Sequence, residues 1–528
     1  MTYRILIADK LDEEGLALLR PHAELVEHPT ITQEELVAVI PEYDALLVRS
    51  RPKVSAEVLR AGAQGRLKVV GRAGVGVDNI DVPAATQAGV TVVNAPTGNT
   101  VAAAEHTVAM MLALARHIPQ AHASVKAGEW KRSQFMGVEM RGKRLGLIGL
   151  GRIASLVATR ALSFSMDVVA YDPYVNTEYA ANQGVQLVSL EELLATSDFI
   201  SLHVPSTDQT RHMLNAERLS RCKPGVRIVN CARGDVVDEA ALLAALDSGH
   251  VAGAALDVFA HEPPAGSPLL CHPKVVLTPH IAGSTVEAQR QVAQDVAEQV
   301  LAVLNGLPAR YAINTPILPP KDLELLTPYI DLAERLGHFL TQFEPGMLSS
   351  VELTAHGPIA DYDLSYLVAA ALKGLLDRVV SERINLVNAR LVARQRGINI
   401  VERRIRHHTE RYENMLSLAV TNGGHQRLVR GSVVQGEPHI VCIDDLWVDF
   451  VAKGHFLLSW HYDRPGIVGR IGTLLGENDI NIASMHLGRR APRGEAIMVL
   501  CLDEAIPEHL FPQLLSMPHN YWVRAVDL

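Results

Sequence analysis

Three side chains that could act on one substrate each follow a different apolar run of the chain. Arg233 follows VRIVNCA, Glu262 follows VAGAALDVFAH, and His280 follows VVLTP. An imidazole can take the proton of a hydroxyl group and return it, and a neighbouring carboxylate can orient the ring. A guanidinium binds a carboxylate with two parallel hydrogen bonds. The set predicts hydride transfer to and from a 2-hydroxy acid.

Each residue also has an ordinary structural interpretation. A single histidine after a strand is more often a surface residue, and Arg233 could pair with Asp235 or Asp238. Asp257, inside the second apolar run, could serve only to order its loop. In open α/β sheets, however, ligands bind beyond the carboxyl ends of the strands, so residues that follow separate strands converge there. This convergence favours the functional interpretation.

The stretch RLGLIGLGRIA (144–154) has the pattern of a dinucleotide-binding turn, an apolar run followed by G-x-G-x-x-A. Gly149 permits the tight turn, Gly151 lets the backbone approach a pyrophosphate, and Ala154 allows close helix packing. The amino end of the next helix would bind the phosphates. A second run, DVVAYD, ends at Asp172, whose carboxylate would accept from a ribose hydroxyl and repel a 2′-phosphate. NAD is therefore expected rather than NADP.

Parallel sheets must position these residues. From residue 1 to about 305, short β-branched runs alternate with helical stretches, a pattern typical of parallel sheets covered by helices. Continuous apolar runs such as ALLVRS and VTVVNAP indicate strands buried on both faces. We therefore expect the candidate residues at the carboxyl edge of a Rossmann-type sheet.

The rest of the chain has a different pattern. The proline-rich segment 307–320 is predicted to be a linker. Helical stretches are expected at 323–343 and 361–397, followed by strand-like runs up to about 450, which predicts an α+β domain. From 455 to 528 the order strand, helix, strand, strand, helix, strand is the ferredoxin-like order.

The composition excludes several classes of partner. The 528 residues carry a formal net charge of −9, with 20% charged residues and no charged tail, so no nucleic acid or anionic membrane is expected as a partner. Five cysteines without a CxxC spacing argue against a disulfide framework and a metal site. The first residues lack a leader pattern and no apolar run is long enough to span a bilayer, so a cytoplasmic location is expected.

Several longer motifs resemble the D-isomer-specific 2-hydroxyacid dehydrogenases over about residues 4–310. They are GRAGVGVDNID (71–81), NAPTGNTVAAAEHTVAMMLALAR (94–116), GLGRIA (149–154), HVPSTDQTRHMLN (203–215), NCARGDVVDEAAL (230–242) and TPHIAGSTVEAQ (278–289). Beyond them, 315–450 and 455–528 are similar to the intervening and ACT domains of the family's long-form members. Those members oxidise 3-phospho-D-glycerate to 3-phosphohydroxypyruvate with NAD, the first step of L-serine biosynthesis.

The resemblance implies an α/β fold of four domains. A Rossmann NAD-binding domain, 98–283, would be inserted in a discontinuous flavodoxin-like substrate domain, 1–97 and 284–306. An α+β intervening domain, 307–453, and a ferredoxin-like βαββαβ ACT domain, 454–528, would follow. The resemblance also implies a homo-oligomer, a dimer or tetramer, with L-serine as a feedback inhibitor.

Carried over by motif, the resemblance assigns Arg233, Glu262 and His280 as catalytic residues. The expected cofactor contacts are Val75, Gly149, Gly151, Arg152, Ile153, Asp172, Val204, Cys231, Ala232, Arg233, Asp257, His280 and Gly283. The expected substrate contacts are Arg51, Arg72, Asn99, Arg233 and, across a dimer interface, Arg132. His461, Asp463 and Asn481 are expected to bind serine, usually between two subunits. Val75 stands where relatives often have threonine, so only its backbone could contact a ligand.

Two other functions remain open at this point. The same residues could act on another D-2-hydroxy acid such as 2-hydroxyglutarate, and activity with non-phosphorylated acids would reveal that. The chain could instead be a non-catalytic NADH-sensing regulator built on the same fold. The complete arginine, glutamate and histidine set and the amino-acid-sensing domain favour the enzyme.

Overall fold

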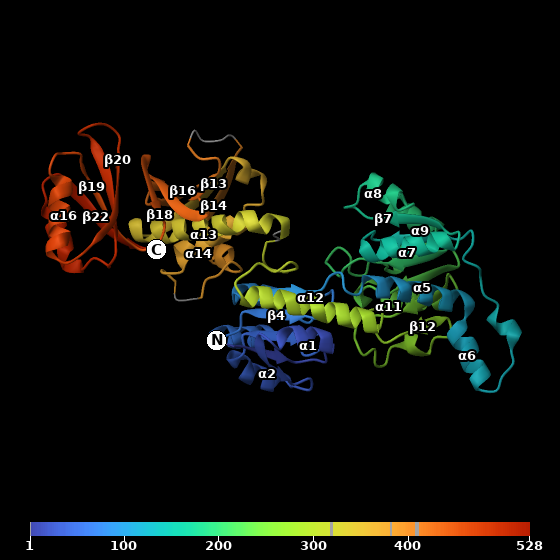
Figure 1. Ribbon diagram of the computed structural model, residues 1–528. Coiled ribbons are helices and arrows are strands. Elements are labelled where there is room, and N and C mark those ends of the chain that lie inside the picture. Colours follow the sequence, from blue (N-terminus) through green and yellow to red (C-terminus); the bar gives the residue numbers. More distant parts are fainter. Residues whose placement is uncertain (1, 317–319, 381–382, 407–410) are drawn as a thin grey trace.

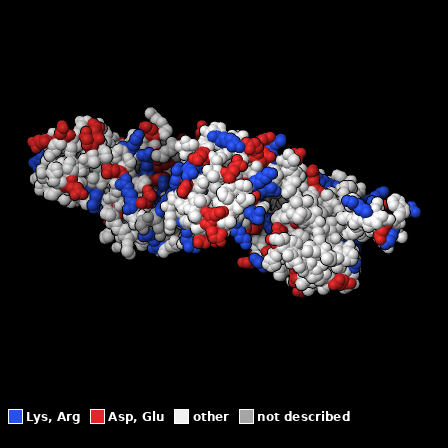
Figure 2. All heavy atoms as spheres, turned by 90° about the horizontal axis from the view of Figure 1, so that it is seen from below, with Lys and Arg blue, Asp and Glu red and all other residues white. Residues whose placement is uncertain are grey.

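The computed structural model describes residues 2–316, 320–380, 383–406 and 411–528, arranged as an elongated molecule (Figure 1). Two α/β domains lie next to each other, and the intervening and ACT domains extend from the first of them. Basic and acidic side chains are interspersed on the face seen in Figure 2. Among the described residues, no helix combines the length and apolar character needed to cross a membrane.

The first domain is a parallel sheet in the flavodoxin-like order β2-β1-β3-β4-β5. Its strands are β1 (Tyr3–Ile7), β2 (Ala23–Glu27), β3 (Ala45–Val48), β4 (Val69–Arg72) and β5 (Thr91–Asn94). All residues of β3 and β5 are buried, because helices cover both faces of the sheet. One face is covered by α1 (Glu13–Leu19) and α12 (Val286–Leu304), the other by α2 (Gln33–Val39), η1 (Ile40–Glu42), α3 (Ala56–Gln64) and α4 (Val82–Gln87).

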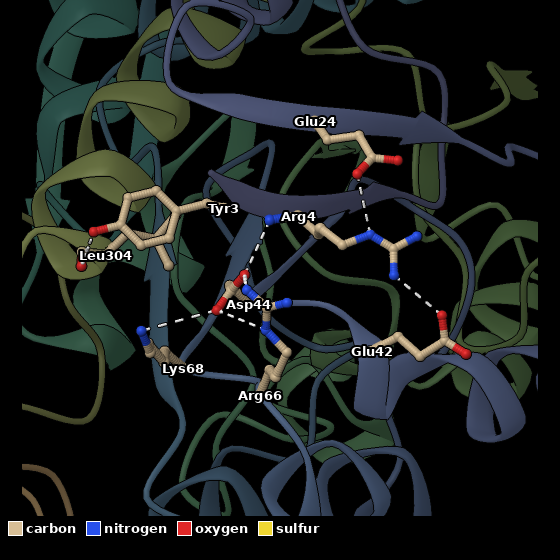
Figure 3. Close-up of polar contacts among 8 residues, drawn as sticks. All are labelled: Tyr3, Arg4, Glu24, Glu42, Asp44, Arg66, Lys68 and Leu304. Atoms are coloured by element: carbon tan, nitrogen blue, oxygen red, sulfur yellow. Dashed lines mark hydrogen bonds and ion pairs between the residues drawn. The ribbon is translucent and has the colours of Figure 1, made fainter. Parts of the chain in front are cut away.

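A buried carboxylate joins the amino ends of these strands (Figure 3). Asp44, which directly precedes β3, accepts hydrogen bonds from the Arg4 N–H (2.9 Å) and from Nη2 of Arg66 (2.7 Å). Lys68 Nζ lies 3.8 Å from its other oxygen. A buried charge requires such partners, so the network anchors β1, β3 and β4 at the edge opposite to the expected ligand site.

The second domain is a seven-stranded parallel sheet in the order β12-β11-β10-β9-β6-β7-β8. Its strands are β6 (Arg144–Ile148), β7 (Asp167–Tyr171), β8 (Gln186–Leu187), β9 (Phe199–Leu202), β10 (Val226–Asn230), β11 (Val251–Leu256) and β12 (Val275–Leu277). One face is covered by α5 (Thr100–Arg116), α7 (Arg152–Ser163) and α8 (Thr177–Asn182), the other by α9 (Leu190–Thr196), α10 (Ala216–Ser220) and α11 (Glu239–Asp247). The strand order reverses between β6 and β9, where a doubly wound sheet binds its nucleotide.

An arm and two short 3-10 turns complete this domain. The arm leaves α5 with α6 (Ile118–Lys126) and η2 (Arg132–Phe135), and it projects from the body of the domain (Figure 1). The 3-10 turns are η3 (Gly234–Val236), directly after Arg233, and η4 (Pro268–Cys271).

The segment predicted to be a linker is tied to the edge of the first sheet. The Ile313 N–H donates to the Val92 carbonyl (2.8 Å), and the Asn314 side chain accepts from the Val92 N–H (2.9 Å). The prolines of the segment correctly indicate an irregular backbone. They give no sign that the segment forms hydrogen bonds with β5, so the sequence could not predict that contact. Residues 317–319 of the segment lie outside the described residues.

The intervening domain is a six-stranded mixed sheet in the order β14-β13-β15-β16-β17-β18. Its elements are α13 (Pro320–Phe343), β13 (Leu348–His356), η5 (Pro358–Asp361), α14 (Ser365–Leu376), α15 (Ala389–Gln395), β14 (Asn399–Ile405), β15 (Met415–Asn422), β16 (His425–Val434), β17 (Glu437–Ile443) and β18 (Leu446–Val451). The prediction of one helical stretch over 361–397 is wrong. Asn385 accepts from the Val387 N–H (2.9 Å) in a turn between α14 and α15, and its side chain donates to the Gly89 carbonyl of the first domain (2.5 Å).

The last domain has the predicted βαββαβ order. Its elements are β19 (His455–Tyr462), α16 (Ile467–Glu477), β20 (Ile482–Arg489), β21 (Glu495–Leu502), η6 (Glu508–Leu510), α17 (Phe511–Ser516) and β22 (Asn520–Asp527). The helices cover one face, and the other face packs on α13, where the Phe343 ring centroid lies 5.6 Å from that of Trp460 and 5.1 Å from that of Trp522. The two C-terminal domains therefore share a hydrophobic core. The predicted fold class, α/β followed by α+β and ferredoxin-like domains, is confirmed.

Candidate active site

A cleft of about 430 Å³ lies between the two parallel sheets, at their carboxyl ends. Its wall comes from residues that follow β3 and β4 in the first domain, residues that follow β10, β11 and β12 in the second, and the start of α12. Arg233, Glu262 and His280 all line it, so three residues that are far apart in the sequence face one space.

His280 and Glu262 form a hydrogen-bonded pair. His280 Nδ1 lies 2.7 Å from Glu262 Oε2, and Glu262 Oε1 accepts from the Phe259 N–H (3.2 Å). Burial alone would raise the pKa of Glu262, but the hydrogen bond from His280 and the attraction of its ring lower the pKa below its usual value. The carboxylate is therefore ionised and accepts from Nδ1–H, so that Nε2 of the neutral ring has a free lone pair.

Arg233 pairs with an acid that the sequence interpretation did not consider. Its Nε lies 3.1 Å from Asp78 Oδ2, and its Nη1 donates to the Ala232 carbonyl (2.7 Å). The suggested pairings are wrong, because Asp235 accepts from the Ser206 hydroxyl and Asp238 caps α11. Among the described residues none accepts from Nη2 of Arg233, so the guanidinium keeps a donor for a ligand in the cleft that it lines.

Two further guanidinium groups line the same cleft. Arg72, at the end of β4, donates from Nε to the carbonyl of Arg49, and Arg49 Nη2 lies 3.3 Å from the Ser284 hydroxyl. Burial, followed by the repulsion of Arg233 and Arg49, lowers the pKa of Arg72 to about 10. Three cationic side chains crowded into one cleft provide a site for an anion.

The glycines of GRAGVG make room for these side chains. A Cβ at Gly74 would lie 1.9 Å from Arg72 Nη1, and one at Gly76 would lie 2.0 Å from Arg233 Nη2. Any larger residue would displace a guanidinium from the cleft. The sequence showed the glycines of this motif but not why Gly76 is needed. Gly76 leaves room for Arg233, which lies more than 150 residues further along the chain.

The loop after β6 fits a dinucleotide. Gly149 has a φ of 89°, in the region that favours glycine, and a Cβ there would lie 2.9 Å from the His203 carbonyl oxygen. A Cβ at Gly151 would meet no described atom within 4 Å, which leaves room for a ligand. Among the described residues no side chain caps α7, so its first N–H groups are available to a phosphate. Asp172 follows β7 and accepts from the Leu150 N–H (2.8 Å).

Comparisons with known proteins identify the family. Residues 108–282 match the model of the D-isomer specific 2-hydroxyacid dehydrogenase NAD binding domain, 325–444 the D-3-phosphoglycerate dehydrogenase intervening domain, and 455–519 the ACT domain. The D-3-phosphoglycerate dehydrogenase of Synechocystis sp. is 45% identical over 516 residues, which cover 97% of this chain and 93% of that protein. This chain belongs to the D-3-phosphoglycerate dehydrogenase family.

Another relative and a solved structure agree with this assignment. The D-3-phosphoglycerate dehydrogenase of Archaeoglobus fulgidus is 46% identical over 505 residues and covers 95% of each chain. The crystal structure of the TT0316 protein from Thermus thermophilus covers 59% of this chain and 99% of its own, with a TM-score of 0.54 and 36% identity. That structure matches a part of the family's fold, whereas the curated relative also matches the intervening and ACT domains.

Three of the five residues expected to contact the substrate lie in the cleft wall. Arg72, Asn99 and Arg233 line the cleft. Arg51 does not, and this expectation requires correction, because β3 ends at Val48 and the first residue beyond it is Arg49. At Arg51 the chain turns away, with its N–H bonded to Asp9 (3.0 Å).

Arg132 lies outside the cleft in a single copy of the chain. It begins η2 on the projecting arm, where its side chain is exposed. The resemblance placed this residue across a dimer interface, and such a contact requires a second copy.

The remaining expected cofactor contacts lie at the carboxyl ends of the two sheets. They are Val75 and Gly283 in the cleft wall, Arg152 and Ile153 at the start of α7, Val204 after β9, and Cys231 and Ala232 after β10. Arg152 Nη1 donates to the Pro96 carbonyl (3.0 Å), which joins the nucleotide loop to the first domain. Burial raises the pKa of the Cys231 thiol to about 12, so this side chain stays neutral beside the cofactor site.

Asp257 is buried beneath the wall of the cleft. Its side chain is 0% exposed, and its carboxylate accepts from the N–H groups of Ile281 and Ala282, at 2.9 Å each. The carboxylate therefore orders the loop after β12, in agreement with the structural interpretation of this residue, and its contact with a cofactor stays a prediction.

The three expected serine contacts do not meet within one copy. His461, on β19, is fully buried, and its Nε2 has no partner among the described residues. Asp463, just beyond, accepts from Arg489 Nη1 (2.7 Å). Asn481 precedes β20 at the other end of the sheet, because Ile482 lies opposite Leu502 and Leu502 opposite His455. Six residues of strand separate the two ends, roughly 20 Å.

Proposed function

We infer that this chain oxidises 3-phospho-D-glycerate to 3-phosphohydroxypyruvate with NAD, the first step of L-serine biosynthesis. The observation that carries this function is the Glu262 and His280 pair in one cleft with the guanidinium groups of Arg49, Arg72 and Arg233. Glu262 and His280 can transfer a proton, and the three guanidinium groups can bind a substrate that has both a carboxylate and a phosphate. The relatives that carry the same domains are named D-3-phosphoglycerate dehydrogenase.

The side chains divide the reaction as follows. Arg233 binds the substrate carboxylate with its fork and polarises the C2 oxygen. His280 Nε2 takes the C2 hydroxyl proton, and the Glu262 carboxylate stabilises the positive charge that then develops on the ring. NAD, when bound, accepts the hydride from C2. In the reverse direction His280 returns its proton to the C2 oxygen.

The assay that tests this function follows NADH consumption with 3-phosphohydroxypyruvate and, in parallel, with 2-oxoglutarate. Turnover of the first substrate with a much lower KM supports the proposal. Turnover of 2-oxoglutarate alone would make the chain a dehydrogenase for another D-2-hydroxy acid. Binding of NADH without turnover of either substrate would support the regulator.

Replacing Arg49 by glutamine should raise the KM for 3-phosphohydroxypyruvate about 10- to 100-fold, because one charged hydrogen bond to the phosphate is lost. The kcat should change much less, since the groups around C2 remain. Arg51→Gln is the matched control, because this arginine lies two residues further along the same loop and outside the cleft. Equal KM values for the two variants would contradict the phosphate assignment.

We propose that the chain forms a homo-oligomer in which the projecting arm contacts a second copy. The arm exposes large apolar side chains, with Trp130 76% and Met136 83% exposed, as well as Ile118 and Val125. An exposed apolar surface of this kind is typical of an interface. Arg132 lies on the same arm, so pairing would carry its guanidinium toward the cleft of the partner copy.

We propose that L-serine inhibits the enzyme at a site shared by two ACT domains. Asp463 provides a carboxylate for the ligand's ammonium group, His461 a buried ring nitrogen without a partner, and Asn481 of a second copy an amide. Since one copy holds these groups at opposite ends of its sheet, inhibition requires the oligomer.

Asp463→Ala is expected to abolish inhibition by serine while kcat and KM in its absence stay unchanged, because the intervening domain separates the ACT domain from the two α/β domains (Figure 1) whose residues line the cleft. Glu477→Ala, an exposed acid at the end of α16, is the charge-matched control and should retain inhibition. The measurement is NADH consumption against serine concentration, with the oligomeric state followed by light scattering. Full inhibition of a monomer or of the Asp463 variant would refute the shared site.

A further inference from the structure

A histidine that the cleft does not contain contacts the network beneath it. His106 lies on α5, and its Nε2 is 3.3 Å from Asp257 Oδ1 and 3.1 Å from Thr278 Oγ1. The His106 side chain is 18% exposed and that of Asp257 0%. A carboxylate at this distance accepts, so the imidazole donates from Nε2.

Asp257 holds the segment 278–282, which contains His280. Its carboxylate accepts from the Thr278 hydroxyl (2.5 Å) and from the two N–H groups that follow His280 (2.9 Å each), and its carbonyl accepts from the His280 N–H (2.8 Å). The φ of His280 is 53°, in the left-handed region, which is uncommon for residues other than glycine. The conformation that presents the imidazole to Glu262 therefore depends on Asp257.

The buried Asp257 carboxylate has one basic neighbour. Among the described residues, His106 is the only basic side chain within ion-pair distance of it. The backbone donors come from the loop that Asp257 has to hold, whereas His106 comes from α5, a long helix packed in the core of the domain. His106 therefore connects the carboxylate to a packed helix that lies outside the loop.

We propose that His106 is a positioning residue for the reaction, which fixes the loop bearing His280 by donating to Asp257 and Thr278. The inference rests on the proposed role of His280 in proton transfer. His106 acts on the reaction through Asp257 and does not itself contact the substrate.

Loss of this donor has a defined kinetic signature. In His106→Leu we expect kcat to fall on the order of 10-fold, the effect of one hydrogen bond to a charged group. The KM for 3-phosphohydroxypyruvate should stay unchanged, because the arginines that bind it are untouched. His106→Gln places an amide N–H near the position of Nε2 and should restore most of kcat. Glu105→Gln, on the same helix and paired with Arg160, is the control that should behave as wild type.

Hydrogen–deuterium exchange of the ligand-free protein gives a second measurement that does not depend on activity. Peptides that cover 278–283 should exchange faster in His106→Leu than in wild type and at the wild-type rate in His106→Gln. Should His106→Leu fail to fold, His106→Asn keeps a polar side chain but is too short to reach Asp257 and Thr278, and we expect the same two effects.

Wild-type kcat and wild-type exchange in His106→Leu would overturn the inference, as would a low kcat in His106→Gln. If the wild-type protein fails to turn over 3-phosphohydroxypyruvate, the proposed function fails, and exchange in the loop still decides whether His106 positions it.

Discussion

Replacing His280 by glutamine is expected to reduce kcat by about 10²- to 10⁴-fold, the range that a general acid or base contributes. Glutamine can still form hydrogen bonds in the cleft, but it cannot take a proton from the C2 hydroxyl at neutral pH. NADH should still bind, because the nucleotide loop after β6 is unchanged and only the contact with the His280 ring is altered. Steady-state turnover in both directions measures the first effect, and the change of nicotinamide fluorescence on binding measures the second.

His261→Gln is the matched control for this variant. It removes the same kind of side chain from an exposed position directly beside Glu262, outside the cleft wall. It should retain kcat and KM. A His280→Gln enzyme as active as this control would show that the proton is transferred elsewhere.

Replacing Arg233 by lysine is expected to reduce kcat/KM by about 10²- to 10³-fold, the loss that follows removal of one preorganised donor to a developing charge. Lysine keeps the charge but not the planar fork, so it cannot bind the carboxylate and polarise the C2 oxygen together. Arg233→Gln lacks the positive charge as well, so its kcat/KM should be lower than that of Arg233→Lys. Initial rates at low substrate concentration give kcat/KM directly.

The control for Arg233 is Arg211→Lys, an exposed arginine that lies 3.9 Å from Asp235. It should have the kinetic constants of wild type. If Arg233→Lys retained the wild-type kcat/KM, a point charge would suffice and the bidentate role would be wrong.

Much of the fold could be predicted because strands buried on both faces have a simple sequence pattern. The run ALLV became β3, and all four of its residues are buried. β14 was missed because it is an exposed edge strand, NIVERRI, whose polar residues hide the alternation. The turn between α14 and α15 was missed because one of its asparagines, Asn385, bonds to another domain.

The sequence by itself determined which side chains follow which strands, because a short motif needs a particular local backbone conformation. Gly149 at a positive φ and the order of Arg233, Glu262 and His280 after three buried runs are of this kind. The stretch VRSR (48–51) holds two arginines, and only the tertiary structure decided which of them faces the cleft. β3 ends at Val48, so Arg49 lines the cleft and Arg51 does not. A strand longer by one or two residues would change that choice.

Tertiary structure also decided the contacts between residues that are distant in the chain. Arg233 pairs with Asp78, and His106 donates to Asp257, across more than 150 residues in each case. In the same way, the sheet register puts Asn481 at the opposite end from His461. Local patterns cannot specify such pairs, because hydrogen bonds and ion pairs depend on distances through space that only the packed sheets and helices fix.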